Sequence, residues 1–165
     1  MTAGTGRQLR VGSGFDVHAF GAGSFVMLGG ERVAHECGLI AHSDGDVLLH
    51  ALVDALLGAA GLGDIGQHFP DSDPQWRGAD SARFVSATMA QLRGAGWQVI
   101  NADLTLLAQV PRLEPHRAPI RERIATLLGI EPSCVNLKAT TTEQLGFIGR
   151  AEGLAAMATV LIGQG

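Results

Sequence analysis

Apolar segments of strand length and of helix length alternate along this chain of 165 residues. A half-buried strand carries apolar residues at every second position, whereas a surface helix repeats them about every 3.6 residues. The alternation of the two patterns is typical of an α/β domain, in which helices pack against a sheet. A chain of this length is sufficient for one such domain with its own hydrophobic core, and no linker-like segment divides it.

The patterns predict the following strands and helices, given in chain order within each class. We expect strands at residues 8–11, 25–28, 31–33, 98–109 and 135–139, and helices at 43–57, 81–93 and 118–128. Gly29-Gly30 between two of the strands favours a hairpin turn, and Ser43 or Asp44 can cap the first helix. Residues 61–80 read as a long irregular segment of the kind that often carries function. The segment 153–162 stays open at this point, since its alanines favour a helix while its length suits a buried strand.

Composition excludes several classes of protein. The net charge is −4 with only 12 lysines and arginines, which argues against a nucleic-acid partner. No apolar run reaches the roughly 18 residues of a membrane span, and the N-terminal residues lack a signal-peptide pattern. Two cysteines are too few for a disulfide scaffold. We therefore expect a cytoplasmic enzyme or binding protein that acts without membrane or nucleic acid.

The strongest local motif is Asp16-Val17-His18. Residues two apart on an extended backbone face the same side, so this carboxylate and imidazole can bind one cation. A third ligand can come from His50 on the first predicted helix. Asp16, His18 and His50 would then form a three-ligand site with one open position, as in catalytic zinc sites. The alternative is an ion-pair cluster without a metal.

Asp46, His50 and Asp54 form a polar stripe on an otherwise apolar helix. A lone histidine on such a helix is usually a hydrogen-bonded core residue. An aspartate one turn away can instead accept the second ring N–H and leave the other nitrogen for a metal. We therefore expect Asp46 or Asp54 to orient His50.

Three further segments could bind anions. His42 and Ser43 lie at the start of the first helix, where free N–H groups and the helix dipole favour negative charge. Thr140-Thr141-Thr142-Glu143 follows a strand and offers hydroxyls for phosphate and a carboxylate for Mg²⁺. Arg112 in a proline-bounded loop could pair with a phosphate. Helix capping would equally explain the serine and threonine motifs, and a solvated charge would explain Arg112.

Five collinear motifs resemble one known family. They are Gly14-Phe15-Asp16-Val17-His18, Ala41-His42-Ser43-Asp44-Gly45-Asp46, Gly63-Asp64-Ile65-Gly66, Phe69-Pro70-Asp71-Ser72-Asp73-Pro74 and Lys138-Ala139-Thr140-Thr141-Thr142-Glu143. In this order they closely resemble the 2-C-methyl-D-erythritol 2,4-cyclodiphosphate synthase family. The resemblance implies a cyclodiphosphate synthase domain at 10–163, preceded by an N-terminal extension at 1–9.

The resemblance implies a phosphorus–oxygen lyase of the non-mevalonate isoprenoid pathway. Such enzymes convert 4-diphosphocytidyl-2-C-methyl-D-erythritol 2-phosphate into 2-C-methyl-D-erythritol 2,4-cyclodiphosphate and release CMP. The family's zinc ligands match Asp16, His18 and His50, and Glu143 matches the residue that holds a phosphate-bridging Mg²⁺ or Mn²⁺. His42 and Thr141 match residues that polarise the phosphates in the transition state.

The resemblance also implies the substrate-binding residues. They are Asp16, His18, His42, Ser43, Asp64, Ile65, Gly66, Phe69, Pro70, Asp71, Ser72, Asp73, Ala108, Gln109, Val110, Pro111, Arg112, Leu113, Thr140, Thr141, Thr142, Glu143, Phe147 and Arg150. Members of the family have a four-stranded mixed sheet with helices on one face, which implies a strand at 153–162. They assemble as homotrimers, with active sites between subunits and a central channel that can bind an isoprenoid diphosphate. Phe147, Arg150 and Glu152 match residues near the mouth of that channel.

Two departures and two alternatives accompany the resemblance. Many members have lysine where this chain has Arg112, and His68 occupies a position that is commonly apolar. One alternative function is a metal-dependent phosphohydrolase of nucleotide diphosphates. The other is a non-catalytic trimer that binds isoprenoid diphosphates.

Overall fold

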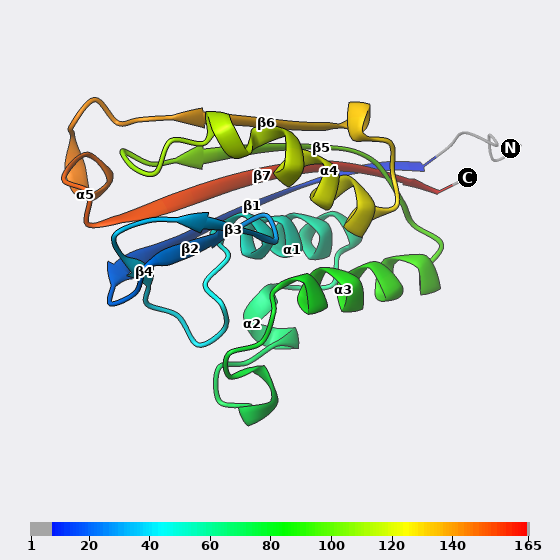
Figure 1. Ribbon diagram of the computed structural model, residues 1–165. Coiled ribbons are helices and arrows are strands. Elements are labelled where there is room, and N and C mark those ends of the chain that lie inside the picture. The colour runs from blue at the N-terminus through cyan, green and yellow to red at the C-terminus, as the bar shows by residue number, and fades with distance from the viewer. Residues whose placement is uncertain (1–7, 165) are drawn as a thin grey trace, which may run out of the picture.

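A computed structural model describes residues 8–164 of the chain (Figure 1). One mixed sheet has the strand order β4-β1-β7-β5-β6, in which β5 and β6 are parallel and the other neighbouring pairs are antiparallel. Its strands are β1 (Gln8–Gly21), β4 (Gly38–Leu39), β5 (Gln98–Leu107), β6 (Val135–Thr140) and β7 (Gly153–Gln164). Strands β2 (Phe25–Leu28) and β3 (Glu31–Ala34) form a separate hairpin around Gly29-Gly30, as predicted.

Three long helices cover one face of the sheet. They are α1 (Val47–Ala60), α3 (Ala82–Gly94) and α4 (Arg117–Leu128). Helix α1 packs on β1 and β7, α3 packs on α1, and α4 contacts both α3 and β6. The shorter elements are α2 (Ile65–His68), α5 (Gly146–Gly149) and three 3₁₀ turns at Pro74–Trp76, Glu114–His116 and Pro132–Cys134. The expected α/β domain with a mixed sheet is confirmed.

Glycines on β1 allow helix α1 to lie directly on the sheet. A Cβ at Gly12 would lie 2.0 Å from the Ala55 carbonyl oxygen, and one at Gly14 would lie 2.0 Å from that of Ala51. Two residues of a strand span about 6.7 Å, and four residues of a helix span about 6 Å. Because these lengths are similar and β1 and α1 run in opposite directions, every second residue of β1 lies opposite every fourth residue of α1. Each successive inward residue of β1 therefore meets an earlier turn of α1.

This close approach predicts a large effect of Gly14→Ala on stability. The new methyl group would collide with helix backbone, which cannot rotate away, so we expect a loss of about 3 kcal/mol or more. Urea unfolding at a fixed protein concentration measures it. Gly94→Ala is the matched control, because a Cβ there meets nothing within 4 Å and alanine favours the helix. Equal unfolding midpoints for Gly14→Ala and the parent would contradict the packing argument.

Residues 153–162, which the sequence pattern left open between helix and strand, belong to strand β7. Its inward residues pair with inward residues of β1, Ala158 with Gly14 and Ala156 with Asp16. Both alanines are buried on the face that α1 covers, next to the glycines of β1. The alanines of β7 therefore serve the same close approach as those glycines and do not indicate a helix. The strand predicted from the resemblance is confirmed.

The predicted boundaries are wrong in several places. The sheet has five strands and not four, because the two-residue β4 pairs with Phe20 and Gly21. The opening strand does not end at residue 11 but continues to Gly21, since its inward glycines are part of the sheet. Helix α1 begins at Val47 and is capped by Asp46, whose carboxylate accepts the N–H of Leu49, so neither Ser43 nor Asp44 is its cap.

The other boundary predictions concern the termini and the irregular segment. Residues 61–80 contain α2 and the 3₁₀ turn Pro74–Trp76, so this segment is only partly irregular. Seven residues of the expected extension 1–9 lie outside the described residues, and the remaining two pair with β7. The boundary of the domain stays a prediction.

Across residues 8–164, the helices are all too short or too polar to span a membrane.

Candidate metal centre and active-site cavities

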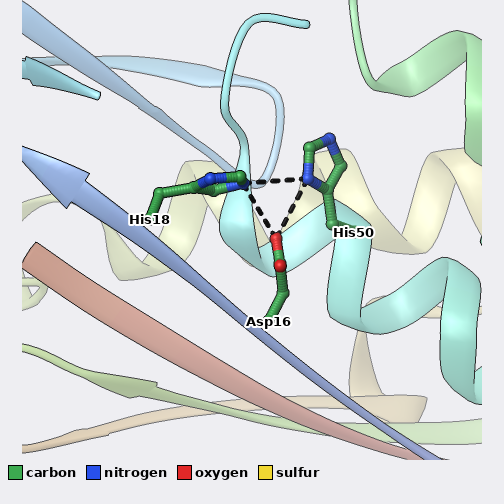
Figure 2. A group of neighbouring side chains, drawn as sticks. All are labelled: Asp16, His18 and His50. Carbon is green, nitrogen blue, oxygen red and sulfur yellow. Dashed lines mark hydrogen bonds and ion pairs between the residues drawn. The ribbon is translucent and has the colours of Figure 1, made fainter. Parts of the chain in front are cut away.

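Asp16, His18 and His50 converge as the sequence predicts (Figure 2). The Oδ2 atom of Asp16 lies 2.9 Å from His18 Nε2 and 3.0 Å from His50 Nδ1. The two ring nitrogens are 3.1 Å apart. Two nitrogens and one carboxylate oxygen thus form a small triangle between β1 and α1.

The alternation of β1 and the turn of α1 place these three side chains. Gly12, Gly14, Asp16 and His18 lie on the inward face of β1, because they are two residues apart. The glycines lie under the body of α1. His50 lies in the first turn of α1, where the inward residues of β1 change from glycine to Asp16 and His18. Where the glycines end, β1 and α1 leave room for side chains, and there the metal-binding groups of Asp16, His18 and His50 can meet.

Burial and mutual contacts set the ionisation of the group. Burial alone would raise the pKa of Asp16, but hydrogen bonds and charge from His18 and His50 lower this pKa to about 2. Burial would lower the pKa of His18, but the hydrogen bond and charge of Asp16 and a hydrogen bond with the backbone of Ile40 raise it. Contact with Asp16 therefore favours the positively charged form of His18, and a bound cation would take the place of that charge.

The donor set fits a divalent transition metal. A tetrahedral ion with bonds of about 2.0–2.1 Å to such ligands holds them about 3.3 Å apart, close to the edges of this triangle. Two imidazoles and one carboxylate are also the ligand types that zinc prefers. All three residues line one cavity, so a ligand in that cavity could reach an ion that they hold.

The residues expected to orient His50 do something else. The buried carboxylate of Asp46 accepts N–H groups of Gly29 and Gly30 at 2.9 and 2.6 Å, which ties the hairpin turn to α1. Asp54 accepts the N–H of Ile65 at 2.8 Å and so fixes the start of α2. The prediction that either aspartate accepts a hydrogen from His50 is wrong.

Two serines lie against the second ring nitrogen of His50. Its Nε2 is 2.8 Å from Ser81 Oγ and 3.1 Å from Ser43 Oγ. Ser81 precedes α3, and its hydroxyl makes no capping hydrogen bond to that helix. A serine at a helix start normally indicates a cap, so the sequence alone did not distinguish Ser81 as a residue of the site.

A cavity of about 500 Å³ opens beside the metal ligands. The loops on either side of it are joined by backbone hydrogen bonds from Gly78 to His42 and from Asp44 to Ala79. His42 is exposed at this cavity, and its Nδ1 lies 3.5 Å from Asp71. The predicted residues that line it are Asp16, His18, His42, Ser43, His50, Ile65, Gly66, Phe69, Pro70 and Asp71.

A second cavity of about 340 Å³ lies at the ends of β5 and β6. Its lining includes the predicted residues Ala108, Gln109, Pro111, Arg112, Leu113, Thr140 and Thr141. The hydroxyl oxygen of Thr141 accepts the N–H of Glu143 at 3.2 Å. Within residues 8–164 no acceptor is found for the Thr141 hydroxyl hydrogen, so this group can donate to a ligand.

The turn after β6 is not a helix start. Glu143 and Gln144 both have positive φ, and α5 begins only at Gly146. Helix capping therefore does not explain Glu143. A non-glycine residue in this conformation costs about 1 kcal/mol or more, which is a common price of presenting a side chain at a functional turn.

The remaining predicted residues border neither cavity directly. These are Asp64, Ser72, Asp73, Val110, Thr142, Glu143, Phe147 and Arg150. Asp64 and Asp73 cap α2 and the turn Pro74–Trp76, so they shape the loop beside the first cavity. Arg150 forms an ion pair with Glu152 of the same chain at 2.7 Å. The Nε2 of His68 lies 2.7 Å from the Leu62 carbonyl, which gives this histidine a structural role.

An α/β domain with this ligand triad at a cavity belongs to the class of candidate metal-dependent enzymes. Residues 9–163 match the model of the YgbB family. The chain therefore belongs to the YgbB family.

Relatives with closely similar sequences carry one enzyme name. A protein of Xanthomonas axonopodis pv. citri is 60% identical over 157 residues, which cover 95% of each chain. A protein of Alcanivorax borkumensis is 60% identical over 155 residues, covering 94% of this chain and 97% of its own. Both are named 2-C-methyl-D-erythritol 2,4-cyclodiphosphate synthase.

Solved structures have the same fold. A 2C-methyl-D-erythritol-2,4-cyclodiphosphate synthase described as a CDP-bound form is 38% identical, with a TM-score of 0.85 over 93% of this chain and 99% of its own. The IspF–CDP complex of Plasmodium falciparum is 32% identical, with a TM-score of 0.82 over 93% of this chain and 95% of its own. The bifunctional IspDF of Campylobacter jejuni is 42% identical, with a TM-score of 0.93 over 97% of this chain, which spans 43% of that longer protein.

Proposed function

We propose that this chain is a cyclodiphosphate synthase that acts on 4-diphosphocytidyl-2-C-methyl-D-erythritol 2-phosphate. The 2-phosphate oxygen attacks the β-phosphorus, the bond from that phosphorus to the α-phosphate oxygen breaks, and CMP leaves. The observation that carries the proposal is 60% identity, over 95% of the chain, to a relative that bears this enzyme name. The ligand triad at a cavity agrees with it.

The residues of the first cavity would hold the metal and the methylerythritol phosphate. Asp16, His18 and His50 would bind Zn²⁺, which when bound supplies Lewis-acid neutralisation of phosphate charge. His42, exposed at the cavity, can donate to a phosphate oxygen and so polarise it. Asp71 lies within reach of the His42 ring and would keep it oriented.

The residues of the second cavity would hold the cytidine diphosphate part. Arg112 provides a guanidinium that can pair with a phosphate through two N–H groups, a geometry that lysine cannot reproduce. The Thr141 hydroxyl can donate to an oxygen that gains charge as the phosphorus reacts. Glu143, at the turn beside this cavity, would hold the Mg²⁺ or Mn²⁺. Since both reacting groups belong to one molecule, positioning supplies much of the catalysis and no protein nucleophile is needed.

A homotrimer would bring the two cavities together. The described cavities share no lining residue, although one substrate must occupy both. The sheet face opposite the helices also carries exposed apolar side chains, namely Leu9, Val11, Phe15, Val17 and Met157. A patch of this kind on a sheet is typical of a subunit interface. In the proposed trimer the three sheets pack by these faces, and the first cavity of one subunit adjoins the second cavity of its neighbour, as the family resemblance implies.

The centre of that trimer is the proposed site for an isoprenoid diphosphate. Phe147 is exposed in α5, and Arg150 is an exposed cation directly after it. An apolar channel with an arginine at its mouth would suit an isoprenoid chain and its diphosphate. Glu152 already pairs with Arg150, so a diphosphate would have to compete with that carboxylate.

CMP release from the purified, metal-supplied protein tests the proposed function. We expect CMP and a cyclic product, and the product formed in ¹⁸O-labelled water should contain no label, because the nucleophile is the substrate's own phosphate. A labelled, linear product would instead identify the phosphohydrolase. Ligand binding without CMP release would identify the non-catalytic trimer.

A further inference from the structure

The hydrogen-bonding partners of Ser81 determine which nitrogen of His50 carries a hydrogen. The Ser81 side chain is fully buried, and its Oγ contacts both His50 Nε2 and the Asp44 carboxylate. Asp44 also accepts the backbone N–H of Ser81 at 3.0 Å and that of Asp46 at 3.1 Å. The carboxylate is thereby held in one orientation, with an oxygen directed at the Ser81 hydroxyl.

A carboxylate can only accept, so the Ser81 hydroxyl must donate its single hydrogen to Asp44. The remaining lone pairs of Ser81 Oγ can then only accept. At 2.8 Å from His50 Nε2, that oxygen requires a hydrogen on Nε2. Ser43 Oγ, at 3.1 Å, lies close enough to accept part of the same N–H. With Nε2 so occupied, Nδ1 is the ring nitrogen that faces Asp16 and His18, where it can donate a hydrogen to the Asp16 carboxylate or bind a cation in place of that hydrogen.

We propose that Asp44 and Ser81 are positioning residues that fix the Nε2–H tautomer and the ring orientation of His50, so that Nδ1 is available to the metal. This inference rests on the metal site of the proposed function. The chain Asp44–Ser81–His50 does what a carboxylate in direct contact with a metal-bound histidine does elsewhere, with one hydroxyl inserted. It also accounts for a buried serine at a helix start that caps nothing.

The first test observes the hydrogen on His50 Nε2 directly. In the metal-free protein, ¹⁵N NMR distinguishes a ring nitrogen that carries hydrogen from one that does not. We expect His50 Nε2 to carry a hydrogen. In Asp44→Ala the Ser81 hydroxyl is released and can donate to Nε2, so a form of the ring without a hydrogen on Nε2 should become populated. A wild-type ring whose Nε2 carries no hydrogen would overturn the proposal.

The second test measures zinc affinity by competition with a chelator, independently of turnover. Ser81→Ala should weaken zinc binding by about 10- to 100-fold, the usual effect of losing a partner of a metal-bound histidine. Thr88→Val is the matched control, since it removes a fully buried hydroxyl of α3 that has no hydrogen-bond partner among residues 8–164. Its zinc affinity should stay at the wild-type value.

The outcomes separate this inference from the proposed function. Unchanged zinc affinity in a folded Ser81→Ala variant, beside tight binding by the wild type, would overturn the role of Ser81 alone. A wild-type protein that binds no zinc would overturn the metal site itself. If Ser81→Ala does not fold, the presence or absence of a hydrogen on Nε2 of the wild-type ring decides the question.

Discussion

His50→Ala should abolish CMP release and zinc binding while the protein remains folded. The substitution removes one of three donors that the structure brings within 4.8 Å of one another. A bound metal is worth several kcal/mol of stabilisation for developing phosphate charge, so we expect a loss of about 10³-fold or more in turnover. Turnover is measured as CMP release, and zinc content is measured on the same purified sample.

The effect on folding should be much smaller than the effect on turnover. His50 contacts Asp16, His18, Ser43 and Ser81 but lies at the rim of a core made of apolar side chains of α1 and the sheet. The circular dichroism spectrum and the oligomeric state should therefore match those of the parent. His116→Ala removes a histidine that lines neither described cavity, and it should keep full activity and zinc content. Full turnover by a zinc-free His50→Ala protein would refute the metal site.

The metal ligands were predictable from the sequence because they follow from strand and helix periodicity. Asp16 and His18 share a face for the simple reason that they are two apart on an extended backbone. His50 was harder to assign as the third ligand, because the sequence places a histidine near a helix start but does not say which strand that helix covers. The glycines of β1 indicate the strand, since they allow α1 to approach the sheet there.

The side chains that hold the metal ligand His50 in place were not predictable from these periodicities. Asp46 and Asp54 have the helical spacing to reach His50, yet each is used by backbone N–H groups of another segment. Ser81 is 31 residues from His50 and meets it only because the loop after α2 folds back along α1. Contacts of this kind depend on loop conformation, which local patterns do not determine. The same reason explains the missed strand β4, whose two residues have no periodicity to recognise.

If the proposed trimer forms, two variants that are each inactive should together regain activity when both are present in one trimer. The first variant is His50→Ala, with a defective first cavity. The second carries Arg112→Ala together with Thr141→Ala, which removes a cation and a hydroxyl from the second cavity. If each active site combines the first cavity of one subunit with the second cavity of its neighbour, mixed trimers contain some sites in which both parts are intact. Neither variant alone has any such site.

The expected recovery follows from the closed ring of three subunits. Every trimer that contains both variants has a single neighbouring pair in which the first cavity and the second cavity are both intact, so about one third of the wild-type activity should return in the isolated mixed trimers. Co-expression with two affinity tags isolates mixed trimers for the CMP assay. The control pairs His50→Ala with His18→Ala, which damage the same cavity, so no mixed site can be intact and no activity should return. Because recovery requires a site shared between chains, mixed trimers as inactive as this control would mean that each chain forms its active site alone.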